Sequence, residues 1–155
     1  MQNKEKLLTV VNPTAYGGIA GRNWLKNQDL FLKKVSKKFN PKVFITHHPG
    51  HTTSIIRQAL LEGIENFVVV GGDGTIDEAI NGFFPIPDPN RKEPPQPINP
   101  NARLSILGAG TGGDFLKTLG LPKRLEDAID VIMTGKESAD IKHHKSVVVH
   151  HPTEH

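Results

Sequence analysis

Short runs of β-branched and aromatic residues alternate along the chain with longer stretches whose apolar positions recur every three to four residues. The short runs predict buried β-strands, at residues 7–11, 42–46, 67–70 and 103–107. The longer stretches predict helices, at residues 21–39, 52–62, 75–83 and 125–133. Because strand and helix alternate, we expect an α/β fold with three layers, in which a largely parallel open sheet lies between helices on both faces.

A glycine turn follows the strand at residues 67–70. Gly71, Gly72 and Gly74 lack the Cβ atoms that would keep a ligand away from the backbone. The free N–H groups of such a turn, and of the helix start behind it, favour an anion, and phosphate is the usual one. An ordinary turn between a strand and a helix is the alternative interpretation.

Polar residues within this turn carry further predictions. Thr75 is expected to open the helix, with Glu78 three positions later, as in a capping box. Asp73 would repel phosphate unless a metal ion or a proton donor lies between them. Its presence therefore indicates phosphate chemistry assisted by Mg²⁺.

Composition restricts the class of protein but does not choose a function. The 155 residues suffice for one domain, and the chain contains no cysteine, which excludes disulfides and thiol chemistry within it. A net charge of +3 favours anionic partners such as nucleotides or acidic lipid surfaces. No apolar run is long enough to span a membrane, and the N-terminus lacks the apolar core of a signal peptide, so we expect a cytoplasmic protein.

Two other loops follow predicted strands. Residues 12–18, Asn-Pro-Thr-Ala-Tyr-Gly-Gly, form a tight loop rich in hydrogen-bond donors. Residues 108–113 satisfy Gly-x-Gly-x-x-Gly, the dinucleotide fingerprint. That fingerprint belongs in the first strand–helix–strand unit, with an acidic residue ending the following strand, whereas Asp127 and Asp130 lie in a predicted helix. A dinucleotide-binding oxidoreductase is therefore the less economical interpretation.

Three surface features leave alternatives open. The lysines of the first helix, Lys33, Lys34, Lys37 and Lys38, are expected to form a solvated face, with contact to anionic lipid headgroups as the alternative. Residues 85–101 hold seven of the 12 prolines and predict an extended surface excursion, interpreted as an insertion at the rim rather than a substrate lid. His47, His48 and His51 are interpreted as loop residues rather than metal ligands.

The segment Gly-Gly-Asp-Gly-Thr-Ile-Asp-Glu-Ala-Ile-Asn-Gly at residues 71–82 resembles the signature of the diacylglycerol kinase catalytic domain family. That family includes bacterial lipid kinases and sphingosine kinases, and NAD kinases and phosphofructokinases carry related glycine–aspartate loops. Residues 12–16 are similar to the family's Asn-Pro-x-(Ser/Ala)-Gly-like loop. Residues 108–115 are similar to its Pro-x-Gly-Thr-x-(Asn/Gly)-Asp-Phe segment, from which Gly108 and Gly113 depart.

The resemblance implies ATP and Mg²⁺ as cofactors, with Asp73 as the catalytic residue that organises the metal or the phosphates. No complete metal-ligand set is predicted within the chain. The expected nucleotide-binding residues lie at the ends of the predicted strands and in the turns that follow them: Asn12, Pro13, Thr14, Ala15, Tyr16, Thr46, Gly71, Gly72, Asp73, Gly74, Thr75, Glu78, Gly110 and Thr111.

The resemblance also implies a division of the chain. Residues 1–140 are expected to form the nucleotide-binding catalytic domain, and residues 141–155, which include a strand-like run at 146–150, the start of a β-rich lipid-binding domain. The implied reaction transfers the γ-phosphate of ATP to a lipid hydroxyl, such as that of diacylglycerol. The 155-residue chain alone is expected to bind ATP or ADP without phosphorylating lipid.

The expected partners are ATP and a lipid substrate at an anionic membrane surface, which would place the protein at the periphery of the inner membrane face. A homodimer is left open, and no nucleic-acid partner is expected, because no basic run interleaved with aromatic residues is present. Two alternatives remain at this stage. One is an NAD-kinase-like kinase of a soluble substrate, and the other is a non-catalytic nucleotide-binding module.

Overall fold

The computed structural model describes residues 3–108 and 125–135, and it confirms the alternation of strands and helices that the sequence predicts. The elements, in chain order, are β1 (Glu5–Val11), α1 (Ile19–Val35), β2 (Phe39–Ile45), α2 (His51–Leu61), β3 (Asn66–Gly71), α3 (Asp73–Gly82), β4 (Arg103–Gly108) and α5 (Leu125–Thr134).

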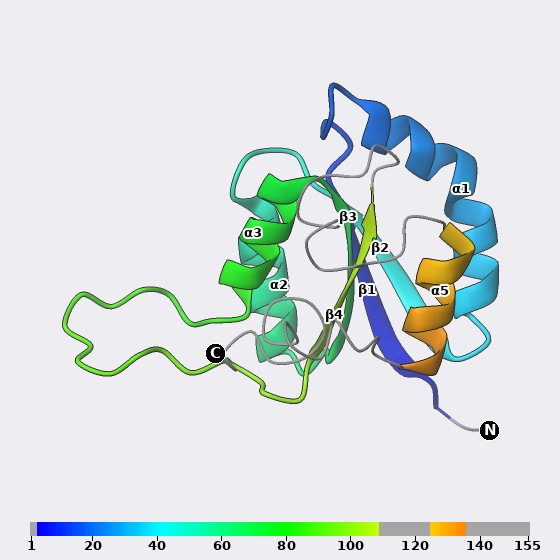
Figure 1. Ribbon diagram of the computed structural model, residues 1–155. Coiled ribbons are helices and arrows are strands. Elements are labelled where there is room, and N and C mark those ends of the chain that lie inside the picture. Colours follow the sequence, from blue (N-terminus) through cyan, green and yellow to red (C-terminus); the bar gives the residue numbers. More distant parts are fainter. Residues whose placement is uncertain (1–2, 109–124, 136–155) are drawn as a thin grey trace.

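The strands form a 4-stranded parallel sheet in the order β2-β1-β3-β4. Helices α1 and α5 cover one face and α2 and α3 cover the other, as Figure 1 shows with the sheet seen nearly edge-on. The three-layer, parallel α/β fold expected from the sequence is therefore confirmed. Because β2 lies on one side of β1 and β3 on the other, the strand order reverses between β1 and β3. Open α/β sheets bind ligands at such a switch point, outside the carboxyl ends of the strands.

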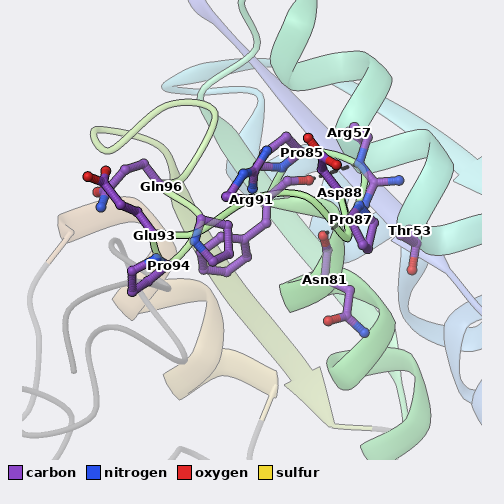
Figure 2. Close-up of a pocket in the computed structure, with 12 residues that line it drawn as sticks. Thr53, Arg57, Asn81, Pro85, Pro87, Asp88, Arg91, Glu93, Pro94 and Gln96 are labelled. Atoms are coloured by element: carbon purple, nitrogen blue, oxygen red, sulfur yellow. Dashed lines mark hydrogen bonds between the residues drawn. The ribbon is translucent and has the colours of Figure 1, made fainter.

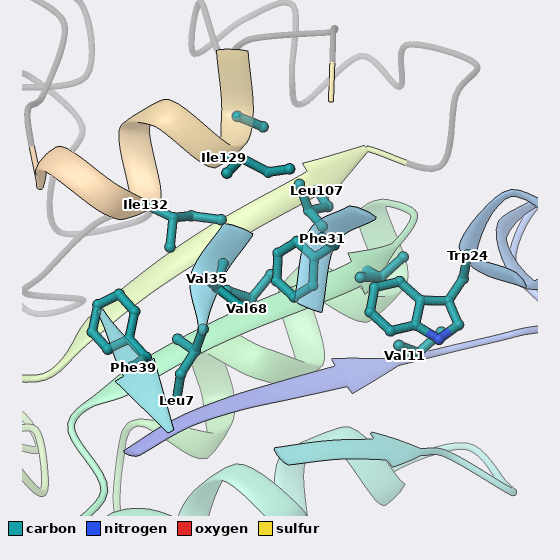
Figure 3. Close-up of a cluster of buried hydrophobic side chains, with 12 residues drawn as sticks. Leu7, Val11, Trp24, Phe31, Val35, Phe39, Val68, Leu107, Ile129 and Ile132 are labelled. Atoms are coloured by element: carbon teal, nitrogen blue, oxygen red, sulfur yellow. The ribbon is translucent and has the colours of Figure 1, made fainter. Parts of the chain in front are cut away.

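Each face of the sheet carries its own apolar core. The nearly continuous apolar runs of β1 and β3 send alternate side chains to opposite faces, which explains why both faces must be covered. Under α1 and α5, the Phe31 and Trp24 rings lie side by side in one core cluster and make an edge contact, with centroids 5.5 Å apart (Figure 3). Under α2 and α3, Phe67 and Phe83 make a similar edge-to-face pair at 5.5 Å.

The first helix is shorter than predicted. It ends at Val35, and the Lys37 and Lys38 amides donate to the carbonyls three residues earlier, so that the chain tightens into a turn. Phe39, expected as the last residue of the helical stripe, instead begins β2 and packs into the same core as Val35. Leu25, expected beside the buried face, is 67% exposed.

Lysines at the amino ends of the strands have local partners. The Lys38 ammonium donates to the carbonyl of Met133 near the end of α5 at 2.8 Å, and Lys4 donates to the carbonyl of Ser36 just after α1. Both cations thus satisfy carbonyl groups at helix C-termini, where positive charge is favoured. Contact of Lys33, Lys34, Lys37 and Lys38 with lipid headgroups stays an untested alternative to the predicted solvated face.

None of the helices in residues 3–108 and 125–135 is long and apolar enough to cross a membrane. The predicted second glycine loop, the strand-like run at 146–150 and the boundary expected near residue 140 all lie outside the described residues.

Candidate functional site

The loops after β1 and β3 lie next to each other at the switch point, and the side chain of Asn12 joins them. Its amide nitrogen donates to the hydroxyl of Thr75, 63 positions later, at 2.9 Å. Its amide oxygen accepts from the Thr14 backbone at 3.2 Å and from the Thr14 hydroxyl at 2.9 Å. The Asn12 backbone N–H donates to the carbonyl of Val70 at 2.8 Å. The sequence-predicted residues 12–14 and 71–75 are thus brought together.

The start of α3 differs from the predicted capping box. The helix begins at Asp73, its N-cap is Gly72 in an extended conformation, and no side chain caps it. Thr75 is only 3% exposed and uses its hydroxyl as the acceptor for Asn12. A Cβ placed on Gly71 would lie 2.5 Å from that hydroxyl oxygen, so only glycine fits against the buried threonine. The capping-box prediction is wrong because the tertiary contact with Asn12 takes the hydroxyl.

The consequence is a helix N-terminus whose N–H groups no N-cap side chain satisfies. The first-turn N–H groups of a helix have no intrahelical acceptors, and here no N-cap side chain replaces them. A Cβ on Gly74 would meet no atom of residues 3–108 and 125–135 within 4 Å, so the described part of the chain leaves room beside this turn. Asp73 is exposed in the same turn. Backbone donors, a positive helix end and one carboxylate together fit a phosphate group accompanied by a cation.

Tyr16 lies over this turn. Its ring is near enough to Gly72 that a Cβ there would be 3.2 Å from ring carbon Cε2. Tyr16 has a φ of 54°, in the left-handed region, and is 37% exposed. The sequence places Tyr16 in the first loop but gives no sign that its ring reaches the second one.

Thr46 follows β2 on the same edge of the sheet. Its backbone N–H donates to the carbonyl of Val11 at 2.9 Å, and the residue is 7% exposed. It is therefore next to the end of β1, but no side-chain hydrogen bond joins it to Asn12 or Asp73. The predicted residues Gly110 and Thr111 lie outside the described part of the chain.

Glu78 lies farther along α3 than the other predicted residues. Its carbonyl accepts from the Thr53 hydroxyl at 2.7 Å, which ties this turn of α3 to α2. The residue is half-buried and lies on the side of α3 that faces α2. The structure thus gives Glu78 a place between the two helices rather than at the uncapped turn.

The histidines after β2 form a ring cluster. The His51 Nδ1 accepts from the His47 backbone N–H at 3.0 Å, and the His48 and His51 rings stack with centroids 4.3 Å apart. Desolvation, followed by repulsion from His48 and His47, lowers the pKa of His51, while Glu78 opposes the shift. Among residues 3–108 and 125–135, no three His, Asp or Glu side chains are grouped to hold a metal ion. His47 and His48 lie in the loop after β2, as the sequence predicts, whereas the prediction is wrong for His51, which is the first residue of α2.

A hollow lies between the proline-rich segment and helices α2 and α3 (Figure 2). Its volume is about 770 Å³, and Phe84, Pro85 and Pro87 contribute apolar lining. Arg57 donates to the carbonyls of Phe84 at 2.9 Å and Asn81 at 3.2 Å, which fixes its guanidinium at the wall. The sequence predicts the surface excursion, and Figure 1 shows it extending outward from the body, but no sequence pattern predicts the hollow.

The structure is an open α/β domain with an uncapped helix start at the switch point of its sheet, and comparison with known proteins identifies the family. The diacylglycerol kinase catalytic domain model matches residues 6–143. The chain belongs to the diacylglycerol kinase catalytic domain family.

Individual relatives agree with this assignment. The chain is 28% identical over 134 residues to the diacylglycerol kinase of Staphylococcus carnosus (strain TM300), covering 85% of this chain and 38% of the relative. It is 29% identical to the enzyme of Staphylococcus saprophyticus with the same coverage. A crystal structure of a putative diacylglycerol kinase from Bacillus anthracis str. Sterne matches with a TM-score of 0.62 and 26% identity, covering 88% of this chain and 42% of that one. The chain thus spans about two fifths of the length of these relatives.

Proposed function

We propose that this chain is the nucleotide-binding part of an ATP-dependent lipid kinase. The observation that carries the proposal is the uncapped start of α3, which the Asn12–Thr75 hydrogen bond fixes beside the loop after β1. This arrangement fits the phosphates of a nucleotide better than a neutral ligand, because backbone N–H groups and the positive end of a helix favour negative charge.

Each group of residues has a distinct role in the proposal. The backbone of residues 72–75 donates to the phosphates, and Gly74 leaves room for them. Asn12 holds the two loops at a fixed separation, so that little reorganisation is needed when phosphate binds. Residues 13–16, Thr46, Glu78, Gly110 and Thr111 are proposed to contact or support the nucleotide, in line with the family resemblance.

Asp73 is proposed as the carboxylate that organises the metal. Mg²⁺ usually binds to one or two carboxylates together with substrate phosphates and water, so a single exposed aspartate beside the phosphate turn fits it. When bound, Mg²⁺ would offset the charge of the phosphates. Asp73 would hold that cation in the first turn of α3, where its own carboxylate is also favoured by the helix end.

Nucleotide titration tests this part of the proposal. We expect the 155-residue chain to bind ATP and ADP more tightly with Mg²⁺ than without it, by calorimetry. Asp73→Asn should lower the Mg²⁺-supported affinity about tenfold and leave metal-free binding equal or stronger, because a repulsive charge is lost. Asp77→Asn, an exposed aspartate on the next turn of α3, is the matched control and should change affinity less than about twofold. Equal losses in both variants, or no nucleotide binding, would contradict the proposal.

The acceptor is proposed to be a lipid hydroxyl such as that of diacylglycerol, and transfer is proposed to require a further β-rich domain beyond residue 140. The names of the relatives support this acceptor over NAD, the alternative substrate. Radiolabel transfer from ATP to diacylglycerol vesicles or to NAD separates the two. We expect no transfer to either by the 155-residue chain, and transfer to diacylglycerol once a β-rich domain from a relative is fused to it.

A further inference from the structure

Tyr16 has a backbone conformation that residues with a side chain rarely adopt. Its φ is 54°, and among the described residues it is the only non-glycine residue with a positive φ. The next two residues, Gly17 and Gly18, continue in the same region with φ of 63° and 93°, where glycine has no steric penalty. Such strained positions occur often at functional sites, so the position of the Tyr16 ring is a reason to look for a function.

The ring is aimed at the N-cap of α3. Ring atoms Cε2, Cζ and Oη of Tyr16 lie 3.2, 3.3 and 3.5 Å from the point where a Cβ of Gly72 would be. That side of Gly72 is the one that the missing Cβ leaves free for a ligand to approach. In this structure the Tyr16 ring occupies that side of Gly72. The described residues still leave room beside Gly74.

We propose that Tyr16 is a cover over the phosphate turn, and that its ring must leave Gly72 before a nucleoside di- or triphosphate can seat its phosphates there. The inference rests on the proposed function, since it assumes that phosphates bind at the start of α3. It changes the role of Tyr16 from a nucleotide contact to a residue that limits access to the turn.

The loop allows the ring to move while the backbone stays in place. The carbonyl of Tyr16 accepts from the Ile19 N–H at 3.2 Å, and the Gly18 N–H lies 3.2 Å from the Thr14 carbonyl, so a turn holds the backbone. A Cβ on Gly17 would meet nothing within 4 Å, so no side chain crowds the next residue. Rotation about the side-chain bonds of a partly exposed tyrosine is fast, so the cover would shift a population rather than block binding.

The population argument sets the size of the effect. If the ring covers Gly72 in about nine molecules out of ten, the apparent affinity for nucleotide is reduced about tenfold relative to an uncovered turn. Removing the ring should therefore raise the affinity by about three- to tenfold and raise the association rate by a similar factor.

Two variants separate the ring from the backbone strain. Tyr16→Ala removes the ring but keeps a side chain at a positive φ, whereas Tyr16→Gly removes both. Leu25→Ala, at an exposed position on α1, controls for general effects of trimming an apolar side chain. MgADP and metal-free ATP are titrated into each 155-residue chain by calorimetry and stopped-flow mixing. Because the chain contains a single tyrosine, the ring of Tyr16 gives one assignable NMR signal, which is followed in the wild type during the MgADP titration.

A cover predicts equal gains of affinity in Tyr16→Ala and Tyr16→Gly, no change in Leu25→Ala, and a tyrosine signal that shifts and saturates with bound MgADP. A loss of affinity in both variants would show that the ring stacks on the nucleotide, which overturns the cover. A gain in Tyr16→Gly alone would assign the effect to backbone strain and overturn it as well. If the wild type binds nucleotide and neither the affinity nor the tyrosine signal responds, the cover fails while the proposed function stands. If no chain binds nucleotide, both fail together.

Discussion

Thr9 illustrates how a single residue in β1 works against stability. Within residues 3–108 and 125–135, its hydroxyl is the only buried side-chain oxygen or nitrogen without a hydrogen-bond partner. Thr9 is 0% exposed, and its place between Leu7 and Val11 puts it on the sheet face under α1. Burying an unpaired hydroxyl costs free energy that an apolar side chain of the same shape would not.

We therefore expect Thr9→Val to raise the free energy of unfolding by about 1 kcal/mol, measured by urea denaturation. Thr75→Val is the matched control: its hydroxyl is equally buried but accepts from Asn12, so the same change should lower stability by about 1 kcal/mol. The expectation fails if Thr9→Val destabilises the protein as Thr75→Val does.

At the scale of elements, α2 and α3 approach each other closely because Gly82 has no side chain. A Cβ there would lie 2.8 Å from the Thr53 carbonyl oxygen and 3.0 Å from the Ile56 Cβ. Gly82→Ala should therefore force the helices apart and lower the free energy of unfolding by about 1–3 kcal/mol. In the same helix, Gly74→Ala meets open space and should be neutral or stabilising by up to about 1 kcal/mol. Equal effects of the two changes in thermal or urea unfolding would contradict this packing argument.

The turn between β2 and α2 should respond to pH through His51. Its Nδ1 can accept from the His47 N–H only when the imidazole is neutral, and its pKa is lowered from the ordinary 6.5 by desolvation, then by His48 and His47, with Glu78 opposing. As pH falls, His51 is therefore protonated at a higher pH in the unfolded chain than in the folded protein. Stability should be lost as pH falls through 6.5 toward the lower pKa of the folded state, with no contribution from this group above that window.

Urea unfolding between pH 7.5 and 5 would measure this dependence. His51→Asn keeps an acceptor oxygen near the His47 N–H but does not titrate, so its stability should vary less with pH than that of the wild type. His48→Asn, which removes the ring stacked on His51, should make the loss of stability smaller, because the folded-state pKa of His51 then lies closer to 6.5 and the pH window of the loss narrows. An unchanged pH profile in His51→Asn would assign the dependence to other groups.

The sequence predicts elements better than it predicts contacts between them. The β-branched runs predict all the described strands, although the glycine turn expected at residues 71–74 is reduced to Gly72, because β3 includes Gly71 and α3 begins at Asp73. The prediction that Phe39 belongs to the first helix is wrong, because its spacing from Val35 suits a helix although Phe39 begins β2. Both residues pack in one core, but they come from different elements. The sequence could not predict the role of the Thr75 hydroxyl, because its hydrogen-bond partner, Asn12, lies 63 residues earlier in the chain. The contact of Tyr16 with Gly72 likewise depends on two loops that only the sheet order brings together.

For the molecule as a whole, different loops lie at the two ends of the parallel sheet. Loops that follow strands lie at the carboxyl end, where Asn12, Tyr16 and Asp73 are found. The proline-rich segment connects the end of α3 to the start of β4, so it must return to the amino end of the sheet. Its base is fixed there, because the Ile98 N–H donates to the Phe83 carbonyl at 2.8 Å and Ile98 packs against the core under α2 and α3.

Replacing residues 86–96 with a Gly-Ser linker of about four residues should therefore leave the fold and the candidate site intact. The linker keeps Ile98 and the Phe84 carbonyl that Arg57 contacts, and shortening a surface loop changes its closure entropy only slightly. We expect the free energy of unfolding to change by less than about 1 kcal/mol and MgADP affinity by less than about twofold.

The same replacement removes most of the residues that line the hollow beside Arg57. It therefore also tests whether that hollow is coupled to the start of α3 at residues 72–75. Helix α3 offers a path for such coupling, because it begins at Asp73 and its Asn81 lines the hollow. Arg57→Lys in the full-length loop is the matched control, since it weakens the contacts to the end of α3 without shortening the segment. A loss of MgADP affinity in both variants would show that the hollow and the start of α3 are coupled, whereas unchanged affinity in both would show that nucleotide binding does not depend on the hollow.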